Sequence, residues 1–429
     1  MGIETQIQLL RYRRTKIVAT LGPSSQSPEM IGKLIEAGVN VFRQNFSHGA
    51  HEEHRALYGA IREQAKAAGR PVAVLADLSG PKIRVGKFPE GPIDLEEGHT
   101  VTVTVRDVPG EPGLIPSQYP ALAEDVQKGD RILLDDGNLE LQVDAIEGTE
   151  IACKVVVGGK LKNHKGINLP GVEVSAPSLT EKDRADAKLA MDLGVDLLAL
   201  SFVRRGEDVQ ALRTLVERHP AEQIPAIIAK IEKPEALENI SEILEIADGI
   251  MVARGDLGVE LPPQAVPMAQ EQLIHHARRR HKPVIVATQM LESMIGNPRP
   301  TRAEVSDVAN AVRSGTDAVM LSGETAAGKY PLEAVQMMDK VARQTEAFLW
   351  EHGLFRFPKE EGGAETVMPV EDAVAQTTAQ LSRNLMVRAI LIISRSGCSI
   401  SVMSSFRPAA PVLGISTDER LSRSQCLLW

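Results

Sequence analysis

Two apolar runs of this chain end in a carboxylate. The run AIIAKIE (226–232) ends at Glu232, and the run GIMVARGD (249–256) ends at Asp256. If these runs are consecutive parallel strands, their carboxyl ends meet at one edge and the two carboxylates lie close together. Two carboxylates with room for water and substrate oxygens are a ligand set typical of Mg²⁺, which is rarely enclosed by protein ligands alone. The sequence therefore predicts a site for Mg²⁺, with Mn²⁺ as an alternative metal.

A basic residue stands two positions before each carboxylate. Side chains two residues apart share one face of a strand, so Lys230 is expected beside Glu232 and Arg254 beside Asp256. The backbone N–H of Gly255 and of the following turn can donate to an anion. In an alternative interpretation, each pair is a structural ion pair that fills the mouth of a barrel.

A third apolar run, VNVFRQNF (39–46), has the same kind of polar end. Arg43, Asn45 and Ser47 are two residues apart, so they line up on one face. Because three runs agree, the functional interpretation is favoured over the structural one.

Eight short runs rich in β-branched residues recur along the chain, and amphipathic stretches of helical period lie between them. Eight strand-and-helix units predict a (β/α)8 TIM barrel, in which the active site lies at the carboxyl ends of the strands. The predicted strands are residues 15–22, 39–46, 71–78, 196–203, 226–232, 249–256, 283–290 and 318–325.

The repeat is interrupted once, after the third run. Residues 82–174 contain alternating segments such as HTVTVTV and EIACKVVV, with Gly and Pro between them and no helical period. This pattern predicts an inserted all-β lid domain with a β-barrel form. Residues 1–81 and 175–345 then make up the catalytic barrel, close to the usual size of about 250 residues for this fold.

A third domain is predicted at residues 346–429. It starts after a long helix and a linker rich in Pro, Gly and charge (355–369), and continues as helix, strand, loop, helix and strand. We expect an α/β regulatory domain. Its strands are too few for a self-sufficient sheet, so the sequence predicts that the domain is incomplete at Trp429.

Composition excludes several classes of protein. The 429 residues have a formal net charge of -9 and no long basic tract, so nucleic acid is not expected as a partner. There is no apolar run of about 18 residues and no signal peptide, so no membrane association is expected. Cys153, Cys398 and Cys426 are odd in number and widely spaced, which predicts neither disulfides nor a zinc cluster. These features predict a cytoplasmic protein.

Two apparent motifs fail on inspection. The stretch GETAAGKY (323–330) fits GxxxxGK, but Tyr330 stands where a P-loop needs Ser or Thr. His48, His51 and His54 are not spaced as HExxH, so a zinc site is not predicted.

Longer motifs point to a known family. In order along nearly the whole chain they are TKIVATLGPSS, FRQNFSHG, DLSGPKIR, KGINLPG, AKIEKPEA, DGIMVARGDLGVELP, ATQMLESM, and TRAEVSDVANAV followed by GTDAVMLSGETAAGKYP. With these motifs the chain resembles the pyruvate kinases. The resemblance implies a barrel with a mobile β lid and a C-terminal regulatory domain. It also implies transfer of a phosphoryl group from phosphoenolpyruvate to ADP, followed by protonation of the enolate to pyruvate, in a homotetramer.

The resemblance assigns roles to individual residues. Glu232 and Asp256 bind Mg²⁺, and Lys230 places its ammonium against the charge that develops in the transition state. Arg43 and Arg84 hold phosphoryl oxygens, and Thr288 is linked to substrate binding and the proton relay. The implied substrate side is Ser201, Arg254, Gly255, Asp256 and Thr288, and the implied nucleotide side is Arg43, Asn45, His48, Arg84 and Lys165.

One departure from the family pattern concerns K⁺. The implied monovalent-cation site is Asn45, Ser47, Asp77 and the carbonyl of Leu78. Lys82 stands where potassium-dependent members carry Glu, and its ammonium can supply the charge that K⁺ would bring. We therefore expect activity that does not require K⁺. The alternative is that Lys82 is only a solvated hinge residue.

The C-terminal domain contains an expected effector loop, SRSGCS (394–399). It resembles the sugar-phosphate loop of the family, and a strand, loop and helix N-terminus form a suitable phosphate cradle. The expected contacts to a sugar-phosphate or nucleotide effector are Ser394, Arg395, Ser396, Gly397 and Ser399.

Two alternative functions are a barrel lyase acting on pyruvate and a non-catalytic scaffold. The lid with its arginines disfavours the lyase, and the retained site residues disfavour the scaffold.

Overall fold

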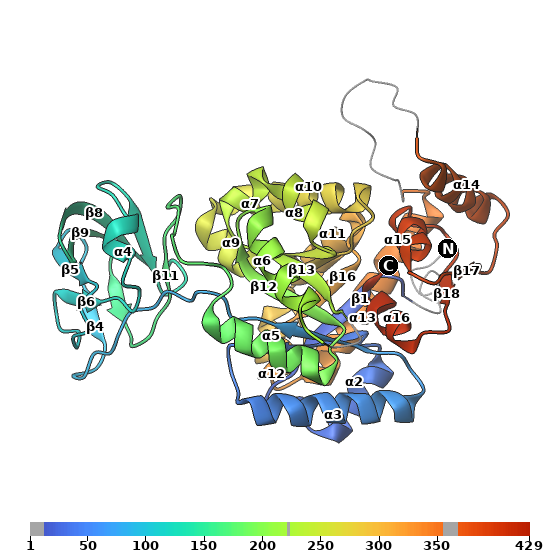
Figure 1. Ribbon diagram of the computed structural model, residues 1–429, viewed down its shortest axis with the longest axis horizontal. Coiled ribbons are helices and arrows are strands. Elements are labelled where there is room, and N and C mark those ends of the chain that lie inside the picture. Colours follow the sequence, from blue (N-terminus) through green and yellow to red (C-terminus); the bar gives the residue numbers. More distant parts are fainter. Residues whose placement is uncertain (1–12, 221–223, 355–367) are drawn as a thin grey trace.

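The molecule has three parts in a row. In Figure 1 a barrel lies at the centre, the β insertion on one side of it and the C-terminal part on the opposite side. This computed structural model describes residues 13–220, 224–354 and 368–429. Residues 1–12 and most of the predicted linker (355–367) lie outside the described residues. The predicted domain boundaries stay predictions.

Eight parallel strands close into a ring, in the order β1-β16-β15-β14-β13-β12-β3-β2. This confirms the predicted (β/α)8 barrel, and each of the eight predicted runs contains one of the strands. The strands are β1 (Lys16–Thr20), β2 (Val41–Asn45), β3 (Ala73–Asp77), β12 (Leu197–Val203), β13 (Ala226–Ile231), β14 (Gly249–Ala253), β15 (Val284–Ala287) and β16 (Ala318–Leu321). Their inward apolar side chains, such as Val18, Leu75 and Ile285, are buried and fill the ring.

The helices around or beside these strands include α2 (Pro28–Ala37), α3 (His51–Ala68), α5 (Glu181–Leu193), α6 (Gly206–Glu217), α8 (Ile240–Ile246), α10 (Val266–Arg279), α11 (Arg302–Ser314) and α13 (Pro331–Glu351). Local sequence sets their ends. In α2, the Ser27 side chain accepts from the Met30 N–H at the start, and Gly38 ends the helix at a φ of 109°. None of the described helices is both long and apolar enough for a membrane span.

The run 249–256 is only partly a strand. Strand β14 stops at Ala253, level with the end of its neighbour β15, so Arg254 has no ladder partner. Helix α9 (Arg254–Glu260) begins there instead. The prediction that Arg254 and Asp256 share a strand face is therefore wrong, because residues two apart in a helix point about 200° apart. The eighth run is shortened in the same way by α12 (Gly323–Ala326).

The insertion is mostly sheet and has its own buried core, which includes Val103, Leu141 and Ile151. Six strands form one sheet in the order β11-β7-β8-β9-β5-β6, and β10 pairs with β4 separately, so among the described residues the insertion does not close the hydrogen-bonded ring of a β-barrel. The elements are β4 (Ile93–Leu95), β5 (Thr100–Thr104), β6 (Leu114–Pro116), α4 (Leu122–Asp125), β7 (Arg131–Leu134), β8 (Leu139–Glu147), β9 (Glu150–Val157), β10 (Gly159–Leu161) and β11 (Ile167–Asn168).

The C-terminal part has the predicted order of helix, strand, helix and strand. Its elements are α14 (Val370–Asn384), β17 (Ile390–Ile393), α15 (Cys398–Ser405), β18 (Val412–Ile415) and α16 (Glu419–Ser424). The two strands pair in parallel.

A buried ion pair anchors this C-terminal part to the barrel. The Arg407 guanidinium lies 2.9 Å from the Asp317 carboxylate, just before β16, and also donates to the Gly315 carbonyl at 2.6 Å. Both side chains are almost fully buried. The ion pair joins the C-terminal part to the amino-terminal end of the barrel strands, opposite the predicted active site.

Substitution Arg407→Ala should lower the free energy of unfolding by about 3 kcal/mol, because it removes the buried cation that pairs directly with the Asp317 carboxylate. The unfolding midpoint in urea or on heating measures the loss. Arg388→Ala is the matched control, since Arg388 belongs to the same part of the chain but is exposed. Equal midpoints for the two variants would show that the ion pair does not anchor the C-terminal part.

Candidate active site

A lysine ammonium lies at the centre of the barrel mouth. Lys230, near the end of β13, contacts Ser201 Oγ at 2.6 Å, Glu232 Oε1 at 2.9 Å and Asp77 Oδ1 at 3.3 Å. Burial lowers the pKa of Lys230, but the carboxylates of Asp77 and Glu232 outweigh burial and raise the pKa overall. The ammonium is therefore charged throughout the neutral pH range.

Two acidic groups face this region. Glu232 is buried and accepts a hydrogen bond from the Phe202 N–H at 2.7 Å. Its pKa is raised, first by burial and also by the negative charge of Asp256, against the opposing effect of Lys230. Glu232 and Asp256 are therefore close enough to repel each other, which a bound cation would relieve.

The donor set fits Mg²⁺. Among the described residues, no group of three or more His, Cys, Asp or Glu side chains could hold a metal ion. Two carboxylates, from Glu232 and Asp256, would leave most of an octahedral shell to water and substrate oxygens, as Mg²⁺ prefers. A structural zinc site needs four protein ligands that close a tetrahedral shell, and these two carboxylates do not provide it.

Asp77, at the end of β3, links two cations. The Lys230 ammonium lies 3.3 Å from Asp77 Oδ1, and Arg43 Nε donates to Asp77 Oδ2 at 2.6 Å. Burial raises the pKa of Asp77, but the charges of Lys230 and Arg43 outweigh it and the pKa is lowered. Arg43 also donates to Thr20 Oγ1 at 3.1 Å, so its guanidinium is held at the mouth of the barrel.

The residues of the predicted monovalent-cation site also lie together. Asn45 is the register partner of Asp77 in β2 and β3, and the Asn45 side chain accepts from the Ser47 N–H at 3.2 Å. The Leu78 carbonyl accepts from Ser201 Oγ at 2.8 Å. The structure therefore brings Asn45, Ser47, Asp77 and Leu78 to the ends of two neighbouring strands.

Lys82 is solvent-accessible at the wall of the same region. Partial burial lowers its pKa, as do the charges of Lys230 and Arg84, whereas Asp256 and Asp77 act in the opposite direction. Its ammonium thus contributes positive charge beside the carboxylates of the site.

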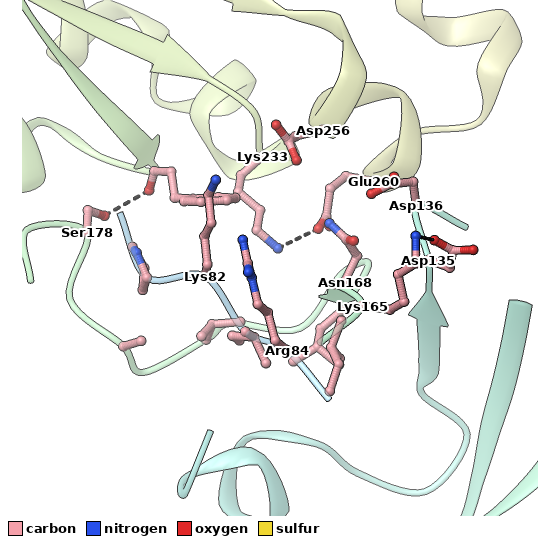
Figure 2. Close-up of a pocket in the computed structure, with 18 of the residues that line it drawn as sticks. Lys82, Arg84, Asp135, Asp136, Lys165, Asn168, Ser178, Lys233, Asp256 and Glu260 are labelled. Atoms are coloured by element: carbon pink, nitrogen blue, oxygen red, sulfur yellow. Dashed lines mark hydrogen bonds and ion pairs between the residues drawn. The ribbon is translucent and has the colours of Figure 1, made fainter. Parts of the chain in front are cut away.

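A cavity of about 270 Å³ lies between the insertion and the barrel. In Figure 2, Lys82, Arg84 and Asp256 line it from the barrel side and the chain entering the insertion, while Lys165 comes from the insertion. Lys165 is ion-paired with Asp135 at 2.6 Å. Acidic side chains line the same cavity, among them Asp136, Asp256 and Glu260, so the lining would suit an anionic ligand that carries a cation.

His48 is exposed near these cations. Partial burial lowers its pKa, and so do the charges of Lys82 and Arg84. A neutral imidazole is therefore favoured at neutral pH. His48 therefore lies near Arg84, another residue of the predicted nucleotide side.

Thr288 follows the last residue of β15 and lies beside α9. A side chain on Gly255 would place its Cβ 2.9 Å from Thr288 Cγ2, so only glycine permits this approach. Gly255, Asp256 and Thr288 line a second cavity of about 620 Å³, together with Asp136 of the insertion. The Arg254 guanidinium donates to the Asp307 carboxylate and to the Thr288 carbonyl.

Two family models match the sequence. "Pyruvate kinase, barrel domain" matches residues 12–335, and "Pyruvate kinase, alpha/beta domain" matches residues 372–429. The chain belongs to the pyruvate kinase family. It is an enzyme, a phosphotransferase of glycolysis built on a TIM barrel.

Relatives in the family cover almost all of the chain. It is 50% identical to a pyruvate kinase of Geobacillus stearothermophilus over 419 residues. This match covers 97% of this chain and 70% of that protein. It is 46% identical to a pyruvate kinase of Sporosarcina psychrophila over 97% of this chain and 71% of that one. The crystal structure of a pyruvate kinase from Cryptosporidium parvum superposes with a TM-score of 0.91 at 36% identity, over 99% of this chain and 87% of the other.

Sequence reasoning missed a second buried lysine and carboxylate pair in this pyruvate kinase fold. Lys233 follows Glu232 directly, and its ammonium lies 2.7 Å from Glu260 Oε1 at the end of α9 (Figure 2). The pair joins the segment that carries Glu232 to the helix that carries Asp256. The only signal in the sequence was the adjacency of Lys233 to Glu232, which does not name a partner 27 residues away.

The predicted effector loop lies far from the active site. It belongs to the C-terminal part, on the side of the barrel opposite the insertion (Figure 1). Ser394 Oγ accepts from the Gly397 N–H at 2.9 Å, and α15 begins after Gly397. Arg395, Ser396 and Ser399 are exposed.

Proposed function

We propose that this chain catalyses the Mg²⁺-dependent transfer of the phosphoryl group of phosphoenolpyruvate to ADP, giving ATP and pyruvate. The observation that carries the proposal is the Lys230 ammonium, held by Asp77 and Glu232 at the carboxyl ends of the barrel strands. Family membership supports the same reaction.

The metal would be held by Glu232 and Asp256, with Mn²⁺ as an alternative to Mg²⁺. When bound, it supplies Lewis-acid stabilisation of carboxylate and phosphoryl oxygens of the substrate. The contribution of the chain is to bring the two carboxylates to neighbouring strand ends, with the Lys230 charge between Glu232 and Asp77.

Lys230, Arg43 and Arg84 provide the positive charge for phosphoryl transfer. Such fixed donors act where charge develops in the transition state and need no reorganisation at that moment. The Asp77 contact holds the Arg43 guanidinium in place, and planar guanidinium groups suit phosphoryl oxygens. Asn45, His48, Arg84 and Lys165 are proposed for the nucleotide side.

Pyruvate formation requires protonation of the enolate after phosphoryl transfer. We assign the Thr288 hydroxyl to this proton relay, supported by its place with Asp256 in one cavity. Ser201 and the Gly255 backbone N–H are proposed contacts for the substrate. Arg254 is a further proposed contact for the substrate, since it lines the same cavity as Asp256 and Thr288, and an additional positioning role is inferred for it below.

We propose that the reaction does not require K⁺, because of Lys82. We expect full activity in K⁺-free buffer, because the Lys82 ammonium supplies the charge that K⁺ would bring to Asp77 and Asp256. Pyruvate release from phosphoenolpyruvate, ADP and Mg²⁺, measured with and without KCl, tests both the reaction and the cation. Activity only with KCl would keep the reaction and remove the role of Lys82; no pyruvate in either buffer would contradict the proposed reaction.

The variant Lys82→Glu should depend on K⁺, since it replaces the ammonium by a carboxylate. The pH profile is a second readout. Because the pKa of Lys82 is lowered, K⁺-free activity should fall as pH rises through a value below 10.5, and KCl should restore part of it. Lys33→Glu, on an exposed part of α2, is the control and should show neither effect.

Three broader properties belong to the same proposal. We propose a homotetramer, regulation by a sugar phosphate or nucleotide at Ser394, Arg395, Ser396, Gly397 and Ser399, and a cytoplasmic location. The first two are supported by family membership and by the strand, loop and helix of the effector loop. The three free cysteines support a reducing compartment.

A further inference from the structure

Thr288 has a rare backbone conformation. Its φ is 75°, and that of Gln289 is 55°. A β-branched residue at positive φ is an outlier, and such conformations cost about 1–3 kcal/mol each unless the surrounding structure holds them. Something in this region must therefore stabilise the turn after β15.

The Arg254 side chain supplies that stabilisation. Nη2 donates to the Thr288 carbonyl at 2.7 Å, and Nε donates to the Ala287 carbonyl at 3.3 Å. Both carbonyls flank the left-handed residue. Arg254 thus holds the peptide groups on either side of the point where the strand turns.

Asp307, on α11, fixes the guanidinium in this position. Its two oxygens lie 2.7 Å from Nη1 and 2.7 Å from Nη2 of Arg254. Nη1 also donates to Gln270 Oε1 at 3.3 Å. The Arg254 side chain is only 11% exposed, and it lines the same cavity as Thr288 and Asp256.

The loop beyond Thr288 is fastened at two further points. Glu324 Oε1 accepts from the Leu291 N–H at 3.0 Å, and Glu304 Oε1 accepts from the Ser293 N–H at 2.7 Å. These contacts limit how far the loop can move. They leave the orientation of Thr288 itself to Arg254.

We propose that Arg254, held by Asp307, is a positioning residue that keeps Thr288 in its left-handed conformation, with its side chain at the wall of the cavity that it shares with Asp256. The inference rests on the proposed function, in which the Thr288 hydroxyl serves the protonation of the enolate. In this role Arg254 acts through the backbone of Thr288, whose carbonyl it holds at 2.7 Å.

Exchange of the methyl protons of pyruvate in D₂O isolates this step. Each exchange breaks one C–H bond and forms one C–D bond, while the proton passes to solvent. We would follow it by proton NMR with the full chain, Mg²⁺ and inorganic phosphate. Asp307→Asn removes the charge that holds Arg254 and should slow exchange about 10- to 100-fold, the scale expected when a group is displaced by about 1 Å.

A double-mutant cycle tests whether the effect passes through Thr288. Thr288→Ala should slow exchange, and adding Asp307→Asn should slow it no further, because the positioned hydroxyl is already absent. Fold losses that multiply in the double variant would overturn the inference. Arg254→Lys serves as a second variant, since an ammonium cannot hold Asp307 and both carbonyls at once, and it should behave as Asp307→Asn does.

Asp248→Asn is the matched control. Asp248 pairs with Arg213 at 2.7 Å and is 36% exposed, against 35% for Asp307, but it precedes β14 at the opposite end of the barrel. A loss of exchange equal to that of Asp307→Asn would show a general effect of breaking an Arg–Asp pair and would overturn the inference. Normal exchange in Thr288→Ala would contradict both the inference and the proposed role of the Thr288 hydroxyl. Pyruvate release by the unaltered enzyme would still support the proposed reaction in that case.

Discussion

Substitution Lys230→Met should lower kcat by about 10²- to 10³-fold, the usual effect of losing one preorganised charge from a transition state. Methionine keeps much of the side-chain length and removes the ammonium that lies 2.6 Å from Ser201, 2.9 Å from Glu232 and 3.3 Å from Asp77. The KM for phosphoenolpyruvate should change much less than kcat, because the charge is needed most where negative charge develops. Initial-rate kinetics of pyruvate release measure both constants.

The loss must be separated from instability, since the variant leaves two buried carboxylates without their shared cation. The unfolding midpoint of Lys230→Met is therefore measured with the rates. Lys33→Met is the control, because Lys33 is an exposed lysine paired with Glu29 four residues earlier. A raised KM with an unchanged kcat would show that Lys230 only binds substrate and does not favour the transition state.

Substitution Glu232→Gln should weaken binding of Mg²⁺ at least about 100-fold, since even residues that only support a metal ligand contribute about 10- to 100-fold. Glutamine keeps the shape of the side chain and the hydrogen bond from Phe202, but it removes one of the two charges proposed for the metal. Binding of Mn²⁺ followed by electron paramagnetic resonance gives a readout that does not depend on turnover. Asp256→Asn should have a similar effect.

Glu260→Gln is a closely matched control for this experiment. Glu260, like Glu232, is a buried carboxylate with a lysine partner, and it lines the same cavity as Asp256. It pairs with Lys233 and is not a proposed ligand, so Mn²⁺ binding should stay within a few-fold of the unaltered enzyme. Equal losses in Glu232→Gln and Glu260→Gln would mean that general disturbance of the cavity, and not loss of a ligand, explains the result.

The predictable part of the site lies where residues are close in sequence. Lys230 lies near the end of β13 and Glu232 directly follows that strand, so their proximity could be predicted from the strand period, and the structure shows the contact at 2.9 Å. Gly255 and Asp256 could likewise be placed at the end of the next strand. Their orientation could not be predicted, because the chain changes from strand to helix at Arg254 only where β15 ceases to offer a partner.

The amino-acid sequence by itself determined the eight strand-and-helix units, the inserted sheet, the order of elements in the C-terminal part and the carboxylates at the strand ends. Hydrophobic period and local end signals act over a few residues, so a linear reading can detect them. Only the tertiary structure decided that Asp77 links Arg43 to Lys230. The same is true of the Arg254 and Asp307 pair that holds Thr288. In each case the partners come from different barrel units, and their meeting depends on ring closure and strand register, which no local pattern specifies.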